Sequence, residues 1–278
     1  MNSMDNFGLT ETSDVAHNLH ILTPDLYDRW HASLDARQKN WLNAQNFKVK
    51  PGTAICLPDY DGHIDSAVGI VDAAYIWDGA KLLSALPKAV WDLQVYDSCI
   101  DHDQLGQLTL GWGLANYRFD RYRNKAKTTL NQLIRPQNVP VTWLNGLLTG
   151  TYLCRDLINL PSNHLTPAEL ETVARQLAEA HQATITIHEG DQLARAFPAI
   201  HTVGRAAETG PRLIDLSWGT SGPKITLIGK GITFDSGGLD LKPSKAMEVM
   251  KKDMGGAAIV LGLAAALMTH GTNIQLRV

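Results

Sequence analysis

Four charged residues in the last fifth of the chain have the types and order expected for metal-dependent hydrolysis. Lys230 follows a short apolar run, Asp235 and Lys242 come next, and Asp253 precedes a stretch of glycines and alanines. Carboxylates bind divalent cations, and an amine whose pKa is lowered by burial or by a neighbouring cation can also do so. Two carboxylates and two amines that converge at a strand end therefore predict a hydrolase that uses metal ions.

Each of these residues also has an ordinary structural interpretation. A lysine that ends a strand is usually a solvated charge. Asp235 begins the string Asp-Ser-Gly-Gly, which is typical of a turn, and Asp253 could cap the helix that follows it. In favour of the metal site, Gly237 and Gly238 permit backbone dihedrals that let the chain wrap closely around an ion. The prediction rests on the combination and not on any single residue.

The segment resembles the leucyl aminopeptidase family of two-metal exopeptidases, the cytosol aminopeptidases. The resemblance is carried by the string GKGITFDSGG at 229–238, by Lys242 and by the run DMGGAA that starts at Asp253. It extends upstream to residues 155–167, which resemble the segment leading into the family's catalytic domain. Residues 117–122 resemble the end of its N-terminal domain.

This resemblance implies an enzyme that releases leucine-like N-terminal residues from peptides with two divalent metal ions. By the same resemblance Lys230, Asp235 and Asp253 bind metal, and Lys242 stabilises the charge that develops in the transition state. Met250 would line the pocket for the side chain of the substrate's first residue. Zinc, manganese and magnesium all suit such a site, because oxygen and amine ligands do not choose sharply between them. The family also implies a homo-oligomer, a hexamer, for the full-length protein.

The chain departs from the family in one respect that concerns the site. The second family signature, Asn-Thr-Asp-Ala-Glu-Gly-Arg, is found nowhere in the 278 residues, although in the family it supplies two further carboxylate ligands and an arginine. With Asp235 as its single protein ligand, one metal ion would be held weakly. We therefore expect the front portion of a longer aminopeptidase, with an exposed sheet edge. Whether this chain is active by itself stays open.

The surrounding pattern is that of an α/β protein. Thr166, Pro167 and Glu169 form a capping box that begins an amphipathic helix. Strands are predicted at 53–57, 66–71, 183–187, 213–218, 224–229 and 274–278, and further helices at 24–41, 145–160 and 246–268. We expect an N-terminal α/β domain at 1–141, which the family resemblance makes macro-domain-like, and a linker helix at 142–162. Residues 163–278 then form a partial α/β metallo-exopeptidase domain with a mixed sheet.

Composition excludes several other classes of protein. The chain is 44% hydrophobic and 19% charged, as globular proteins are, and its net charge of −3 predicts no general attraction to nucleic acid or acidic membranes. Three scattered cysteines favour a reducing compartment. The N-terminus lacks the pattern of a secretory signal, and the apolar stretch 255–268 is short for a membrane span. We expect a cytoplasmic protein with peptides as its partners.

Two alternatives place the chain in another class, as an inactive binding or assembly module. A basic and aromatic cluster could bind nucleic acid, although the acidic net charge argues against it. It consists of Tyr117, Arg118, Phe119, Arg121, Tyr122, Arg123, Lys125 and Lys127. The first domain could instead bind a nucleotide, although GxGxxG and Walker sequences are absent.

Overall fold

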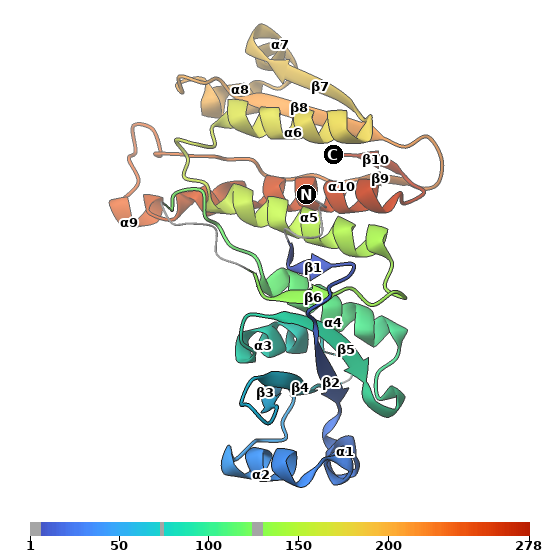
Figure 1. Ribbon diagram of the computed structural model, residues 1–278. Helices are drawn as coiled ribbons and strands as arrows, with labels where there is room; N and C mark the ends of the chain where they lie inside the picture. The colour runs from blue at the N-terminus through green and yellow to red at the C-terminus, as the bar shows by residue number, and fades with distance from the viewer. Residues whose placement is uncertain (1–6, 73–74, 124–129) are drawn as a thin grey trace. The chain divides into compact units, whose positions relative to one another are not determined.

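Two compact units make up the chain, Met1–Leu144 and Asn145–Val278. The computed structural model describes residues 7–72, 75–123 and 130–278 (Figure 1). Each unit is built around its own mixed β-sheet with helices against it. The predicted fold class, α/β with a mixed sheet, is therefore confirmed.

The first unit contains a six-stranded sheet with the order β1-β6-β5-β2-β4-β3. Its strands are β1 (Leu9–Thr10), β2 (His17–Leu22), β3 (Thr53–Pro58), β4 (Ile64–Ile70), β5 (Val90–Val95) and β6 (Gln132–Ile134). Neighbouring strands are parallel, except that β3 pairs antiparallel with β4 in a hairpin. The strands predicted at 53–57 and 66–71 are confirmed as β3 and β4.

Short helices connect these strands. They are η2 (Pro24–Leu26), α1 (Tyr27–Ser33), α2 (Ala36–Ala44), α3 (Trp77–Ala85), η3 (Tyr96–Ser98) and α4 (His102–Ala115). The prediction of one helix at 24–41 is wrong, because the backbone is extended at Leu34 and Asp35. Asp35 then starts α2 through a capping box with Gln38, which satisfies backbone N–H groups at the new helix start. Trp30 and Leu42 from α1 and α2 join a buried cluster with residues of β2, β3 and β4.

The second unit contains a four-stranded sheet with the order β7-β8-β10-β9. Its strands are β7 (Thr184–Glu189), β8 (Arg212–Trp218), β9 (Lys224–Thr226) and β10 (Gln275–Arg277). β9 and β10 are parallel, and the other pairs are antiparallel. β9 lies at the sheet edge and all three of its residues are exposed, as expected for that edge. It is shorter than the predicted strand at 224–229.

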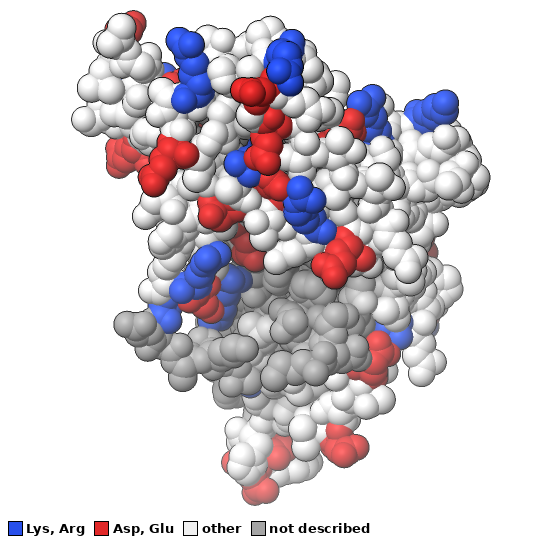
Figure 2. Space-filling view, turned by 90° about the horizontal axis from the view of Figure 1, so that it is seen from above, with Lys and Arg blue, Asp and Glu red and all other residues white. Residues whose placement is uncertain are grey.

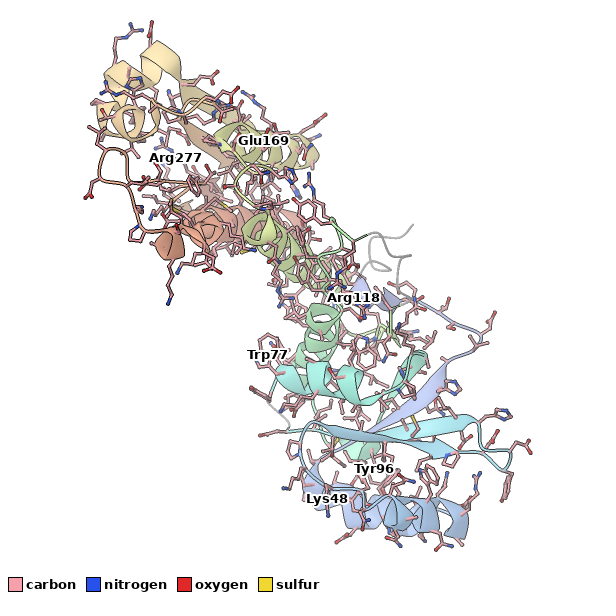
Figure 3. The ribbon with its side chains drawn as sticks, turned by 90° about the vertical axis from the view of Figure 1, so that its left-hand side faces the viewer. Lys48, Trp77, Tyr96, Arg118, Glu169 and Arg277 are labelled. Atoms are coloured by element: carbon pink, nitrogen blue, oxygen red, sulfur yellow. The ribbon has the colours of Figure 1, made fainter. Side chains whose placement is uncertain are left out.

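Seven helical segments accompany this sheet: α5 (Val141–Asn159), α6 (Pro167–His181), α7 (Gly190–Ala196), α8 (Pro198–Gly204), α9 (Ser244–Met247), η4 (Met250–Met254) and α10 (Gly255–His270). The capping box of α6 is confirmed, since the Thr166 N–H donates to the Glu169 carboxylate at 3.0 Å. Figure 3 labels Glu169 at this helix start and Arg277 on β10. The predicted single helix at 246–268 is wrong, because the chain forms α9, η4 and α10 in succession.

Helices α5 and α10 lie side by side because glycines let their backbones approach closely (Figure 1). A Cβ atom on Gly150 would lie 2.2 Å from the carbonyl oxygen of Gly262, closer than real contacts allow. Together η4 and α10 form a helical stretch of 21 residues, Met250–His270, in which a window of 18 residues has a mean hydropathy of 1.4. By length and composition alone this stretch could cross a membrane. Half of that window is buried within the protein, and a helix in a protein core can be equally long and apolar.

Candidate functional site

Lys230 and Asp253 form an ion pair beside the start of α10. The Nζ atom of Lys230 lies 2.8 Å from Oδ1 of Asp253. Beyond β9, the Leu227 N–H still donates to the Arg277 carbonyl at 2.8 Å, so the chain stays beside β10 as it approaches Lys230. Asp253 lies in η4, and the N-cap of α10 is Met254, which makes no side-chain capping bond. Asp253 therefore forms an ion pair and does not cap α10.

Two glycines bring the Lys230 segment within hydrogen-bonding distance of α10. The Ala257 N–H donates to the Lys230 carbonyl at 2.9 Å. A Cβ atom on Gly229 would lie 2.6 Å from the carbonyl oxygen of Gly256, and one on Gly256 would lie 2.9 Å from the Lys230 nitrogen. Any side chain at either position would push the two segments apart. The small residues of this run therefore place Lys230 beside Asp253.

Asp235 and Lys242 form a second ion pair across a glycine-containing turn. The Lys242 Nζ atom lies 2.7 Å from Oδ2 of Asp235, while the Gly237 N–H donates to Oδ1 at 2.9 Å. The Lys242 N–H donates to the Ser236 carbonyl at 2.8 Å and closes the turn. Gly237 and Gly238 have φ angles of +93° and +77°, which strongly favour glycine. Asp235 is thus both the turn residue and the ion-pair partner.

Asp235 is affected electrostatically by both lysines of the site. The hydrogen bond from Lys242 is the main cause that lowers the pKa of the Asp235 carboxyl, and the Gly237 N–H lowers that pKa further. The positive charge of Lys230 also contributes to the lower pKa. The side chains of Asp235 and Asp253 are 41% and 35% exposed, so an ion can reach both carboxylates from solvent.

Met250 connects the Asp235 turn to the turn that carries Asp253. Its side chain is buried, with 7% exposure, and its Sδ atom accepts the Asp235 N–H at 3.3 Å. Met250 is the first residue of η4, and Asp253 belongs to the same turn. Sequence reasoning found Met250 only through the family resemblance, since a thioether acceptor leaves no signal in sequence.

Lys251 has a structural partner that the sequence did not indicate. Its Nζ atom donates to the Asn159 carbonyl at 3.4 Å, near the end of α5. This contact attaches the Lys251 side chain to α5. Lys252 is exposed.

Comparison with known proteins tests the family resemblance independently. The catalytic domain of the cytosol aminopeptidase family matches residues 152–278, and the N-terminal domain of M17 aminopeptidases matches residues 18–136. The chain belongs to the cytosol aminopeptidase family. The family predicted from the motif residues is thereby confirmed, and the two matches fall largely in different structural units.

Curated relatives and solved structures of cytosol aminopeptidases agree with this assignment. The probable cytosol aminopeptidase of Geobacter sp. (strain M21) is 35% identical over 224 residues, which are 74% of this chain and 43% of the relative. That of Aeropyrum pernix is 30% identical over 237 residues, 82% of this chain and 48% of the relative. The chain thus spans about half the length of the curated relatives it matches.

Among solved structures, the cytosol aminopeptidase from Coxiella burnetii superposes with a TM-score of 0.88 at 38% identity, over 97% of this chain and 59% of that one. The bottromycin maturation enzyme BotP in complex with Mn superposes with a TM-score of 0.77 at 27% identity. That match covers 95% of this chain and 58% of BotP.

The charged side chains of the two ion pairs fit divalent cations by donor type. Carboxylate oxygens and nitrogen donors suit zinc, and carboxylates also suit manganese and magnesium. In the structure each carboxylate is paired with a lysine, so the negative charge that would attract a cation is already balanced locally. The four residues predicted from sequence are therefore brought together in two pairs.

A further group of metal-binding residue types lies in the hairpin between β3 and β4. The ligand atoms of Asp59, Asp61 and His63 all lie within 4.8 Å of one another. Oδ1 of Asp59 already accepts the N–H groups of Asp61 and His63, at 2.9 and 2.8 Å. Sequence reasoning did not single out this group, and these hydrogen bonds explain it as a turn.

In its described part, residues 117–123, the basic and aromatic segment makes local side-chain contacts. The Phe119 and Tyr122 rings make an edge contact, and Arg123 pairs with Asp120 at 3.5 Å. Lys125 and Lys127 lie outside the described residues. On the face shown in Figure 2, acidic and basic side chains are interspersed and do not form one extended basic patch.

Proposed function

We propose that the protein is a metal-dependent aminopeptidase that releases leucine-like N-terminal residues from peptides. The observation that carries this proposal is the pairing of Lys230 with Asp253 and of Lys242 with Asp235 at adjoining turns of a chain in the cytosol aminopeptidase family. Carboxylates and amines gathered in this way suit a site that binds cations and acts on a peptide carbonyl.

Lys230, Asp235 and Asp253 are the residues that would hold two divalent cations, which are zinc, manganese or magnesium. When bound, such ions supply Lewis-acid polarisation of the substrate carbonyl and a more acidic water. Asp235 and Asp253 supply negative charge that is open to solvent. Lys230 would release Asp253 and offer its side-chain nitrogen to a cation. In the structure the Nζ atom of Lys230 contacts the Asp253 carboxylate.

Lys242 would act on the substrate in a different way. Its ammonium lies 2.7 Å from Asp235 and is partly exposed, so it is held at the site by one short contact. A fixed positive charge beside a scissile carbonyl stabilises the negative charge that develops on the oxygen in the transition state. Met250 is proposed to contact the first side chain of the substrate. Its burial leaves only a small part of its surface for that contact.

We also propose a cytoplasmic location and a homo-oligomer, a hexamer by family resemblance. The location follows the relatives, which are named cytosol aminopeptidases. Peptides are the proposed partners, and neither nucleic acid nor a membrane is proposed as one.

The test is hydrolysis of a leucine chromogenic amide with added Mn²⁺ or Zn²⁺, together with direct titration of Mn²⁺ binding. We expect Mn²⁺ binding by the 278-residue chain that is lost in Asp253→Ala. In any form of the protein that hydrolyses the amide, Asp253→Ala and Lys242→Ala should each abolish most activity. Neither binding nor hydrolysis in the wild-type chain, or wild-type rates in either variant, would contradict the proposal.

A further inference from the structure

We propose that Met250 is a positioning residue, whose buried thioether fixes the Asp235 turn relative to Asp253. The inference rests on the proposed function, because it assigns to that same site a residue that holds two proposed metal ligands in register. It differs from the substrate-contact role in that it predicts an effect on the protein before any substrate binds.

The contact joins the two carboxylate-bearing segments directly. The Asp235 N–H donates to Sδ of Met250 at 3.3 Å. Met250 and Asp253 both belong to η4, a turn of five residues. The hydrogen bond therefore connects the backbone at one carboxylate to the turn that carries the other.

The other hydrogen bonds of the Asp235 turn are local to it. Gly237 donates to Asp235, and Lys242 donates to Ser236 and Asp235, so all these partners would move together with the loop. In the described structure, the bond to Met250 is the hydrogen bond by which residues 235–242 attach to another segment. This hydrogen bond therefore fixes the position of residues 235–242 relative to η4.

The turn at the other end of this contact is itself anchored. Lys251 donates to the Asn159 carbonyl of α5 at 3.4 Å. The side chains of Met250 and Met254 are buried, with 7% and 1% exposure. Packing thus holds the Met250 side chain in place, while its sulfur accepts a hydrogen bond from the Asp235 backbone N–H. The position of η4 therefore determines the position of Asp235.

Methionine and leucine have similar volumes, so exchanging one for the other tests the effect of the hydrogen bond with little change in packing. Met250→Leu keeps an apolar side chain of similar size but removes the weak sulfur acceptor. Met254→Leu is the matched control, because it makes the same change in the same buried turn. The described hydrogen bonds include none from Asp235 to Met254.

The experiment measures two properties of the purified 278-residue chain and its two variants. Solvent exchange of the Asp235 amide, followed by NMR, should be about three- to tenfold faster in Met250→Leu, the factor expected for a typical net hydrogen bond. Mn²⁺ binding, followed by titration, should be about tenfold weaker, as when a residue that orients a metal ligand is lost. Met254→Leu should leave both values within about twofold of wild type, since it removes no hydrogen bond to the site.

Each outcome decides the proposal. Unchanged exchange in Met250→Leu, faster exchange with unchanged Mn²⁺ affinity, or equal effects in Met254→Leu would each overturn it. If the wild-type chain binds no Mn²⁺, the proposed function fails for this chain. In that case the exchange rates alone decide whether Met250 holds Asp235 in place.

Discussion

The Lys230 ammonium lies 2.8 Å from the Asp253 carboxylate and joins the segment after β9 to the turn before α10. Pairs as exposed as this one add little to stability, because water screens the attraction and two flexible side chains must be ordered. The importance of the pair lies in its position. It places an amine and a carboxylate at the junction where the glycine contact between Gly229 and Gly256 brings the two segments together.

Replacing Lys230 should weaken metal binding while it leaves the stability of the fold almost unchanged. In Lys230→Met the apolar stem is kept and the amine is lost. We expect the free energy of unfolding to change by about 1 kcal/mol or less, because the ion pair is exposed, while Mn²⁺ affinity falls. Thermal melting and Mn²⁺ titration on one sample measure both, and Lys224→Met, at an exposed residue of β9, serves as the control. Unchanged Mn²⁺ affinity in Lys230→Met would refute the ligand assignment.

The two adjacent glycines at the start of α10 should respond differently to alanine. A Cβ atom on Gly256 would lie 2.9 Å from the Lys230 nitrogen, whereas one on Gly255 would lie 3.8 Å from Cδ1 of Ile158, an ordinary contact. Gly256→Ala should therefore lower the free energy of unfolding by about 1–3 kcal/mol through overpacking. Gly255→Ala should be neutral or stabilising by up to about 1 kcal/mol, since alanine favours the helix. Chemical denaturation of the two variants tests this difference, and equal effects would show that the contact is not tight.

The Lys242 side chain should control the protonation of Asp235. Because the hydrogen bond from Lys242 lowers the Asp235 pKa in the folded protein, Lys242→Met should raise this pKa towards its ordinary value. The lowered pKa favours folding above the pKa of the unfolded chain, and this contribution is lost as the pH falls through the folded-state pKa. NMR titration of the Asp235 carboxyl gives the direction. Lys245→Met, at an exposed neighbouring lysine, should leave the pKa unchanged, and a similar rise in both variants would show a nonspecific charge effect.

The local parts of the fold could be predicted from the sequence, whereas the contacts between distant segments could not. Thr166 and Glu169 meet within one turn, so their spacing alone predicts the capping box and the start of α6. The division of 246–268 into α9, η4 and α10 leaves no comparable local signal. It is accompanied by contacts from far along the chain, such as that of Met250 with Asp235 and that of Lys251 with Asn159.

The same limit applies to the site. The residue types and order of Lys230, Asp235, Lys242 and Asp253 suffice to recognise the family. Which lysine pairs with which carboxylate depends on the close approach of Gly229 to Gly256 and on the path of the loop, and both are tertiary properties. From the sequence alone, helix capping is the simplest interpretation of Asp253. In the structure Asp253 instead forms an ion pair with Lys230.

Adjacent lysines in η4 offer a last test of how this turn is held. Lys251 donates to the Asn159 carbonyl at the end of α5, where a positive charge also interacts favourably with the helix dipole. Lys251→Met should therefore lower the free energy of unfolding by about 0.5–1.5 kcal/mol, the range for one hydrogen bond. Lys252→Met removes the same charge from an exposed neighbour and should have almost no effect. Urea denaturation of both variants measures the difference. Equal stabilities would mean that η4 is fixed by the packing of its two methionines and not by this lysine.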